Sequence, residues 1–210
     1  MTGKIEVITG PMFSGKTTEL LHRLEKYILA DKSYIALKPD KDTRLQNTSI
    51  MTIRGMITVH YELVACLDFS VDSDVIVLDE AQFFGPELIR FCQKAKDTGK
   101  VVLVSGLDMD YNRKPFGYLC ELMAIADSVT KLTAVCACGK DAQYTKKIGG
   151  DHTRLVEIGD HCYVPCCTDC YNELNGTKNF DEETANQISN WLNENGFEDA
   201  SLALDCEFDL

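Results

Sequence analysis

The sequence lacks any apolar run that approaches the length of a membrane-spanning helix, so we expect no membrane partner. It also lacks internal repeats and Pro- or Ser-rich linkers, which argues against repeat architectures and loosely tethered domains. The first apolar segment begins at Lys4, and this leaves no room for a secretory signal. We therefore expect a cytoplasmic protein.

Positive charge is scarce and is absent from the end of the chain. The 21 Lys and Arg residues face 33 Asp and Glu residues, which gives a net charge of −12. Residues 179–210 contain nine acids and no Lys or Arg, so the preceding residues carry only −3. The chain has no basic stripe and no interleaving of basic and aromatic residues. We therefore expect no nucleic-acid partner.

What the chain does contain is a regular alternation of apolar strands and amphipathic helices. Its 210 residues, 45% hydrophobic and 26% charged, are enough for one core and a smaller module. The predicted strands are Lys4–Thr9, Tyr34–Lys38, Asp74–Asp79, Lys100–Gly106 and Val129–Val135. The predicted helices are Thr17–Ala30, Pro86–Asp97 and Tyr118–Ala126. This order predicts an α/β fold with a doubly wound, mostly parallel sheet.

A complete G-x-x-x-x-G-K-T phosphate-binding loop follows the first strand and precedes the first helix. Its glycines allow backbone N–H groups to turn towards phosphate oxygens, and the new helix directs its positive end at the same anion. The lysine is expected to reach the β- and γ-phosphates, and the threonine hydroxyl to bind Mg²⁺. The loop residues are Gly10, Pro11, Met12, Phe13, Ser14, Gly15, Lys16 and Thr17.

Two neighbouring acids stand at the end of the strand Asp74–Asp79: its last residue and the residue that follows it. They are candidates for the second part of the nucleotide site. An acid in the position of Asp79 can hold Mg²⁺ near Thr17, usually through water. The next residue, Glu80, is then free to accept a proton from the group that attacks the γ-phosphate. If that group is water the protein is an ATPase, and if it is a substrate hydroxyl the protein is a kinase.

The ten cysteines indicate thiols and metal ligands rather than disulfides. Two close pairs can present four thiolates to one structural Zn²⁺: Cys136, Cys138, Cys167 and Cys170. The first pair has one intervening residue where two are commoner, and Cys162 and Cys166 offer alternative ligands.

The change in composition predicts three parts. Residues 1–132 form the ATP-binding domain, residues 133–178 a small zinc-ribbon-like domain, and residues 179–210 an acidic segment. Within the last part, Asp181–Asn195 is predicted to form one helix with an apolar stripe. Ala142–Ile148 and Arg154–Ile158 are predicted as short strands.

Several motifs in order resemble the cytosolic (type II) thymidine kinases over residues 3 to about 173. Besides the phosphate loop they are Lys41-Asp42-Thr43-Arg44, Asp79-Glu80-Ala81-Gln82-Phe83-Phe84, Arg113-Lys114-Pro115-Phe116-Gly117, Lys131–Cys136 and Tyr144-Thr145-Lys146. The resemblance implies ATP-dependent transfer of a phosphoryl group to the 5′-hydroxyl of thymidine. It also implies that Glu80 is the general base and that Asp42 and Arg44 lie near the transferred group.

The resemblance further implies a pocket for the thymine base. Aromatic walls would come from Phe83, Tyr111 and Phe116, although phenylalanine is the common residue at position 111. The thymine methyl group would contact Met12, Leu107, Thr145 and Tyr163. Residues 149–163 would form a lasso over the nucleoside, with zinc as a structural ion. Members of the family are commonly homotetramers inhibited by thymidine triphosphate (dTTP), which the residues themselves do not indicate.

Two alternatives remain open on the sequence. One is a related nucleoside kinase with a different choice of base, because the methyl pocket rests on resemblance. The other is a zinc-containing phosphate-loop ATPase that acts with nucleic acid, against which the acidic tail and near-neutral body argue.

Overall fold

The computed structural model describes residues 2–40, 50–53, 57–149 and 162–176. Two compact units divide the chain. The first comprises the chain up to Gly10, Gly15–Asp108 and Pro115–Leu132. The second begins at Thr133 and also takes in Pro11–Ser14 and Met109–Lys114. The sequence did not indicate that these two short segments group with the later part of the chain.

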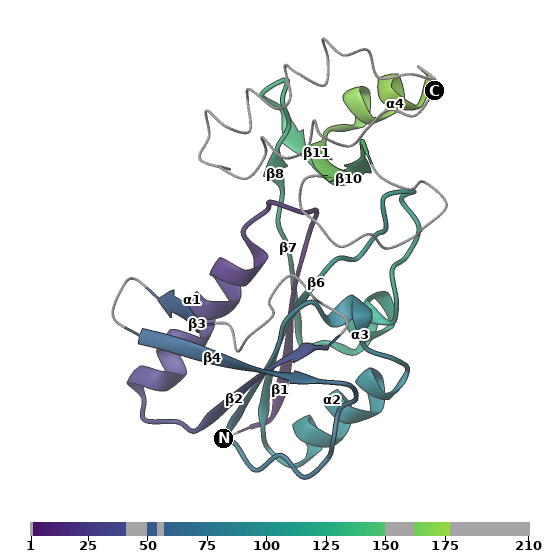
Figure 1. The fold of residues 1–210 in the computed structure, drawn as a ribbon. Coiled ribbons are helices and arrows are strands. Elements are labelled where there is room, and N and C mark those ends of the chain that lie inside the picture. The colour runs from purple at the N-terminus through teal and green to yellow at the C-terminus, as the bar shows by residue number, and fades with distance from the viewer. Residues whose placement is uncertain (1, 41–49, 54–56, 150–161, 177–210) are drawn as a thin grey trace. The chain divides into compact units, whose positions relative to one another are not determined.

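The first unit is built on a seven-stranded sheet with the strand order β3-β4-β2-β5-β6-β1-β7 (Figure 1). Six neighbouring strands are parallel, and only β3 runs antiparallel to its neighbour β4. The strands are β1 (Lys4–Thr9), β2 (Tyr34–Pro39), β3 (Ile50–Ile53), β4 (Ile57–Val64), β5 (Val75–Leu78), β6 (Val101–Gly106) and β7 (Ser128–Lys131). The predicted doubly wound, mostly parallel α/β fold is confirmed.

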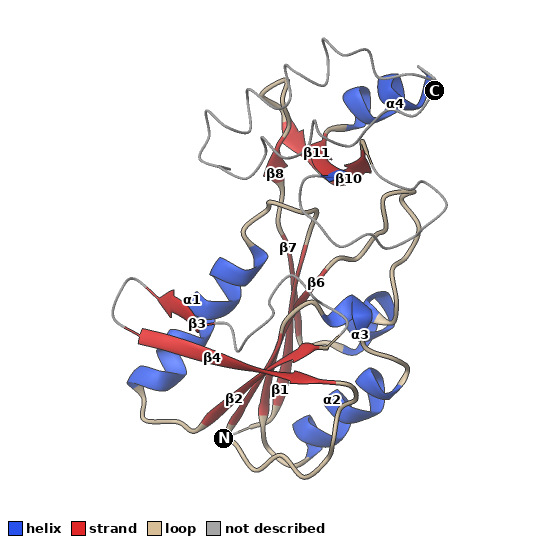
Figure 2. Cartoon of the chain, in the orientation of Figure 1, coloured by secondary structure: helices blue, strands red, loops and turns tan. Residues whose placement is uncertain are grey.

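Helices cover both faces of this sheet because its central strands are apolar on both sides (Figure 2). Ile76 and Leu78 of β5 pack with α2 (Glu87–Asp97) and α3 (Leu119–Ile125) in one cluster. The alternate residues, Val75 and Val77, pack with α1 (Lys16–Leu29) in the other. Successive side chains of a strand point to opposite faces of the sheet. A strand that is covered on both faces, such as β5, therefore needs an uninterrupted apolar run.

Two features of the sheet differ from the sequence prediction. The hairpin β3–β4 was not predicted, although β4 alternates between buried Val59 and Tyr61 and exposed Thr58 and His60. The predicted strand Val129–Val135 is two strands, because β7 ends at Lys131 and a separate β8 occupies Ala134–Val135. Since β7 pairs with β1 and β8 pairs elsewhere, the chain changes sheets between them.

The second unit contains two small antiparallel pairs and one helix. β8 pairs with β9 (Asp141–Ala142), and β10 (Tyr144–Lys147) pairs with β11 (Tyr163–Cys166). Helix α4 (Thr168–Gly176), which was not predicted, follows β11 and packs Tyr171 against Val164 and Cys166. The predicted strand Arg154–Ile158 and helix Asp181–Asn195 lie outside the described residues. Among the described residues, every helix is too short or too polar to cross a bilayer.

Candidate active site

The phosphate loop joins the end of β1 to the start of α1, as the motif requires. Gly15 adopts a left-handed conformation, with φ of 78°, and is the N-cap of α1. Its carbonyl accepts the first helical hydrogen bond, from Glu19 N at 3.0 Å. Phe13 also has a positive φ, 64°, which a residue with a Cβ adopts only at a cost. The chain thus turns sharply just before Lys16, and the helix N-terminus provides positive potential for an anion.

Asp79 is a buried carboxylate held by several hydrogen bonds and one ion pair. It lies just after β5 and is 1% exposed. Its Oδ2 lies 3.1 Å from Lys38 Nζ and 3.2 Å from Thr17 Oγ1. Its Oδ1 accepts hydrogen bonds from Ser105 Oγ and, at 3.1 Å, from Glu80 N. Donors from α1, β2 and β6 therefore fix this carboxylate in one orientation.

Sequence reasoning missed Lys38 and Ser105. Lys38 is 5% exposed, and a buried ammonium needs a counter-charge, which Asp79 provides. Both residues occupy the carboxyl halves of parallel strands, where ligands of open α/β sheets bind. The signal that the sequence offered for Lys38 was a cationic residue at the end of the predicted strand Tyr34–Lys38.

Tyr61 contributes a second buried polar group beside this carboxylate. Its ring lies under Lys38, with Nζ 4.8 Å from the ring centroid. Its hydroxyl has no hydrogen-bond partner within the described part of the chain. Burial, together with the charges of Asp79 and Glu80, raises the pKa of the Tyr61 phenol well above its usual value. The phenol therefore stays protonated and uncharged.

Glu80 adopts the left-handed conformation, with φ of 54°, between β5 and a short 3₁₀ turn (η1, Ala81–Phe83). Its Oε2 accepts a 2.7 Å hydrogen bond from Gln82 Nε2. The other end of the Gln82 amide, Oε1, accepts a 2.9 Å bond from Leu107 N. Strained backbone of this kind is common at functional sites, and here it directs a carboxylate that Gln82 orients.

Two glycines allow the chain to approach Gln82 closely. A Cβ at Gly106 would lie 2.6 Å from Gln82 Oε1, and a Cβ at Gly117 would lie 2.3 Å from the Gln82 carbonyl oxygen. Gly117 also has a φ of 56°, which a larger residue would adopt only with strain. The 3% exposed Gln82 is therefore fixed from two sides.

The two phenylalanines expected beside the base lie together in the first unit. The rings of Phe83 and Phe116 are 5.7 Å apart and nearly perpendicular, at 86°. Phe116 N donates to the carbonyl of Asp108 at 3.0 Å, and the Asp108 carboxylate binds Lys131 Nζ at 2.5 Å. Both rings are only partly buried, which leaves aromatic surface for another group.

The second unit brings together the other residues that the resemblance placed near the base. Met12 N donates a 2.9 Å hydrogen bond to Thr145 Oγ1. Tyr163 on β11 is paired with Lys147 on β10, and Lys147 Nζ lies 5.6 Å from the centroid of the Tyr111 ring. Thr145, Lys147 and Tyr163 are all at most 7% exposed.

Four cysteine sulfurs form a cluster in the second unit: Cys136, Cys138, Cys167 and Cys170, all within 4.8 Å of one another. A hydrogen bond from Lys140 N, the largest cause, lowers the pKa of Cys138, whereas burial raises the pKa of Cys136 and of Cys170. The Lys140 ammonium also joins the two pairs through a 2.7 Å ion pair with Asp169. Four converging thiols fit a closed tetrahedral zinc site.

The alternative ligands lie outside that cluster. Cys166 on β11 is 3% exposed and packs with Val164 of the same strand and Tyr171 of α4. Burial raises its pKa to about 12. Cys162 is 2% exposed and precedes the same strand. Among the described cysteines, only the four predicted ligands converge.

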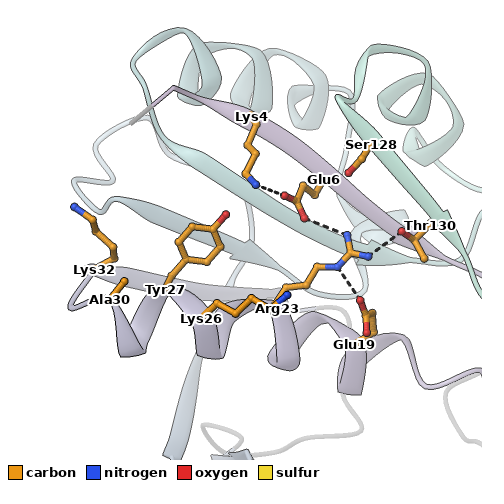
Figure 3. Close-up of a pocket in the computed structure, with 10 residues that line it drawn as sticks. All are labelled: Lys4, Glu6, Glu19, Arg23, Lys26, Tyr27, Ala30, Lys32, Ser128 and Thr130. Carbon is orange, nitrogen blue, oxygen red and sulfur yellow. Dashed lines mark hydrogen bonds and ion pairs between the residues drawn. The ribbon is translucent and has the colours of Figure 1, made fainter.

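A cavity of about 650 Å³ in the first unit shares no residue with the predicted site. Its lining comes from α1, β1 and β7 and is strongly charged (Figure 3). Arg23 crosses it to bind Glu19 at 2.8 Å, Glu6 at 3.1 Å and Thr130 at 2.8 Å. The charges are largely paired with one another, so we assign no ligand to this cavity.

Three groups of predicted residues lie wholly or mainly outside the described residues. They are Asp42, Arg44 and most of the lasso 149–163. The other predicted side chains fall into two sets, one in each unit. The first set includes Asp79 and Glu80, and the second includes Thr145 and Tyr111.

Comparison with known proteins supports one family. A family model described as "Thymidine kinase" matches residues 3–171. The cytosolic thymidine kinase of Gallus gallus is 40% identical over 173 residues, covering 80% of this chain and 77% of the relative. Thymidine kinase a of Arabidopsis thaliana is 43% identical, covering 81% and 75%. The thymidine kinase of Myxoma virus (strain Lausanne) is 38% identical, covering 80% and 96%.

Proposed function

This chain belongs to the thymidine kinase family and phosphorylates thymidine with ATP, and we propose that Glu80 is the general base of that reaction. The observation that carries the proposal is the pairing of a fixed Asp79 with an adjacent Glu80 that Gln82 orients. Glu80 takes the proton from the 5′-hydroxyl of thymidine while the 5′-oxygen forms a bond to the γ-phosphorus of ATP. The bond between the γ-phosphorus and the oxygen that bridges it to the β-phosphate breaks, and ADP and thymidine monophosphate are formed.

The ATP phosphates are proposed to bind the loop Gly10–Thr17, with Lys16 at the β- and γ-phosphates. Magnesium accompanies ATP in this reaction and neutralises charge on the phosphate oxygens. Thr17 and Asp79 fit this ion, because a hydroxyl and a carboxylate 3.2 Å apart offer the oxygen ligands that it prefers. Lys38 and Ser105 already occupy the Asp79 oxygens, which supports an interaction through water.

Thymidine recognition is proposed to use side chains of both sets. In the first unit these are Phe83, Phe116 and Leu107, and the partly buried aromatic pair supports this role. In the second unit they are Met12, Tyr111, Thr145 and Tyr163. By resemblance, Arg44 is proposed to offset charge on the transferred phosphoryl group and Asp42 to lie near it.

The cysteine cluster is proposed to hold a structural zinc ion. Its four thiols leave no ligand position for substrate, so the ion's role would be to fix the fold around it. The domain boundaries 1–132, 133–178 and 179–210 remain proposals. We also propose a homotetramer, inhibition by dTTP and a cytosolic location. The location is supported by relatives that are named as cytosolic enzymes.

The proposed activity is tested with Mg-ATP and a panel of nucleosides: thymidine, deoxyuridine, deoxycytidine and deoxyguanosine. Single-stranded DNA serves as the control for the alternative ATPase function. We expect phosphorylation of thymidine, weaker phosphorylation of deoxyuridine and negligible reaction with the others. Hydrolysis of ATP that rises only with DNA would contradict the proposal.

A further inference from the structure

Tyr171 connects the segment that follows the last cysteine of the cluster to the segment that carries Tyr111. Its side chain is 3% exposed, and its hydroxyl donates a 2.6 Å hydrogen bond to the carbonyl oxygen of Tyr111. Tyr171 comes directly after Cys170, and its own backbone N–H donates to the carbonyl of Cys167 at 2.9 Å. A short covalent and hydrogen-bonded path therefore joins two of the cysteine ligands to Tyr111.

The ring of Tyr171 is also fixed in place. Arg113 lies over it, with the guanidinium carbon 4.4 Å from the ring centroid, and Lys146 Nζ lies 4.9 Å from the same centroid. The Tyr144 ring packs against it at 5.5 Å. Cations over an aromatic face are attracted to it and restrict its motion. The hydroxyl is thus a donor in a fixed position.

The segment Met109–Lys114 also has hydrogen bonds within itself. Asp110 accepts hydrogen bonds from Asn112 N and Lys114 N through one carboxylate oxygen, both at 2.8 Å. Asp110 N donates to the carbonyl of Lys114 at 2.8 Å. These bonds shape the turn, but they do not fix where it lies in the second unit. The Tyr171 hydroxyl and the Arg113 guanidinium contribute to that anchoring, together with Lys147 Nζ, which lies 5.6 Å from the centroid of the Tyr111 ring.

We propose that Tyr171 is a positioning residue for thymidine recognition, acting through the Tyr111 carbonyl to place the Tyr111 ring. The inference rests on the proposed function in one respect, the contact of Tyr111 with the base. It gives the cysteine cluster an indirect role in substrate affinity, through Cys170 and Tyr171. Tyr171 touches neither thymidine nor ATP in this account.

The test is Tyr171→Phe in the full-length, zinc-loaded protein. This change removes the hydroxyl and retains the ring with its cation contacts. We expect the KM for thymidine to rise about five- to tenfold, as for the loss of one buried hydrogen bond. The KM for ATP and the zinc content are expected to stay unchanged. Tyr144→Phe, which removes a hydroxyl from the neighbouring ring, is the matched control.

A second measurement reports on the anchoring without any turnover. Amide hydrogen exchange of residues 109–114 is expected to be faster in Tyr171→Phe than in the wild type or in Tyr144→Phe. Unchanged exchange and an unchanged thymidine KM would overturn the inference. So would an equal rise in both KM values with loss of zinc, since that pattern marks a general structural defect.

An active wild-type kinase whose Tyr171→Phe variant keeps a normal KM for thymidine overturns this inference alone. A wild-type protein that does not phosphorylate thymidine overturns the proposed function and this inference together.

Discussion

Gln82 donates a 2.7 Å hydrogen bond to the Glu80 carboxylate, and the same amide accepts one from the backbone of Leu107. Because Gln82 is 3% exposed and both ends of its amide are used, its orientation is fixed. It in turn fixes one carboxylate oxygen of Glu80, whose backbone is in the left-handed conformation. The orientation of the proposed base is therefore determined by a residue with no direct chemical role.

Gln82→Met tests that relationship. Methionine has a similar length but cannot donate to Glu80, and it leaves Leu107 N without its acceptor. We expect kcat to fall about tenfold, by roughly 1.4 kcal/mol of transition-state stabilisation, while the KM for ATP is unchanged. Gln93→Met, at an exposed position of α2, is the control. Equal kcat values in both variants would show that Glu80 needs no orientation by Gln82.

The buried pair of Lys38 and Asp79 predicts a stability effect that a second substitution reverses. Lys38→Met leaves the Asp79 carboxylate buried without its counter-charge, so the free energy of unfolding should fall by about 3 kcal/mol. Lys38→Met combined with Asp79→Asn should recover most of that loss but remain inactive. Urea denaturation measures the stability of each protein, with the exposed Lys26→Met as control.

If the losses in free energy of unfolding caused by the two single substitutions add up in the double variant, a direct Lys38–Asp79 pairing is contradicted. Recovery of activity along with stability would contradict the role of Asp79 at the magnesium site. The two readouts therefore separate the structural part of this site from its function.

Zinc content should depend on the cluster cysteines and not on other exposed thiols. Cys138→Ser is expected to lose the ion and to weaken thymidine binding more than ATP binding, because the cluster lies in the second unit with Thr145 and Tyr111. Cys66→Ser, also at an exposed cysteine, should keep one zinc per chain. Metal analysis and equilibrium binding of each substrate measure the effect. Unchanged thymidine affinity in a folded, zinc-free protein would contradict this prediction.

Asp127 predicts a pH dependence of stability. The Lys96 ammonium at 2.6 Å and the backbone N–H of Ile5 at 2.8 Å lower the pKa of this carboxyl. The interaction therefore stabilises the fold above the unfolded pKa, about 4, and is lost as pH falls through the lower folded pKa. Since the group is largely exposed, the effect should be below about 1 kcal/mol.

The measurement is the difference in free energy of unfolding between wild type and Asp127→Asn. We expect the wild type to be more stable at pH 7 and the gap to close below pH of about 4. A gap that is constant over this range would show that the ionised carboxylate contributes nothing.

The sequence predicted the parts of the molecule that depend on local pattern. The apolar runs of β5 and β6 and the amphipathic α1 and α2 were placed to within one residue of their observed ends. The sequence predicted Cys167 as a ligand and left Cys166 as an alternative. The structure gives a physical reason, because Cys166 is the last residue of β11 and its side chain packs with Val164 and Tyr171.

What the sequence did not predict depends on contacts between distant strands and segments. Lys38 meets Asp79 only because β2 and β5 are neighbours in register. The bond between Tyr171 and Tyr111 joins residues 60 positions apart, and no local pattern marks either partner. The alternation of polar and apolar residues in β4 was a usable sequence signal for that strand. Its partner β3 is only four residues long, which is too short for such a pattern to stand out.

The most direct test of the central claim is a single-turnover comparison of wild type and Glu80→Gln with Mg-ATP and thymidine. Glutamine keeps the size of Glu80 but cannot accept the proton, so the rate of thymidine monophosphate formation should fall by about 10² or more. Equilibrium binding of ATP and of thymidine, measured on the same samples, should stay near wild type. Near-normal turnover in Glu80→Gln would contradict the assignment of Glu80 as the base.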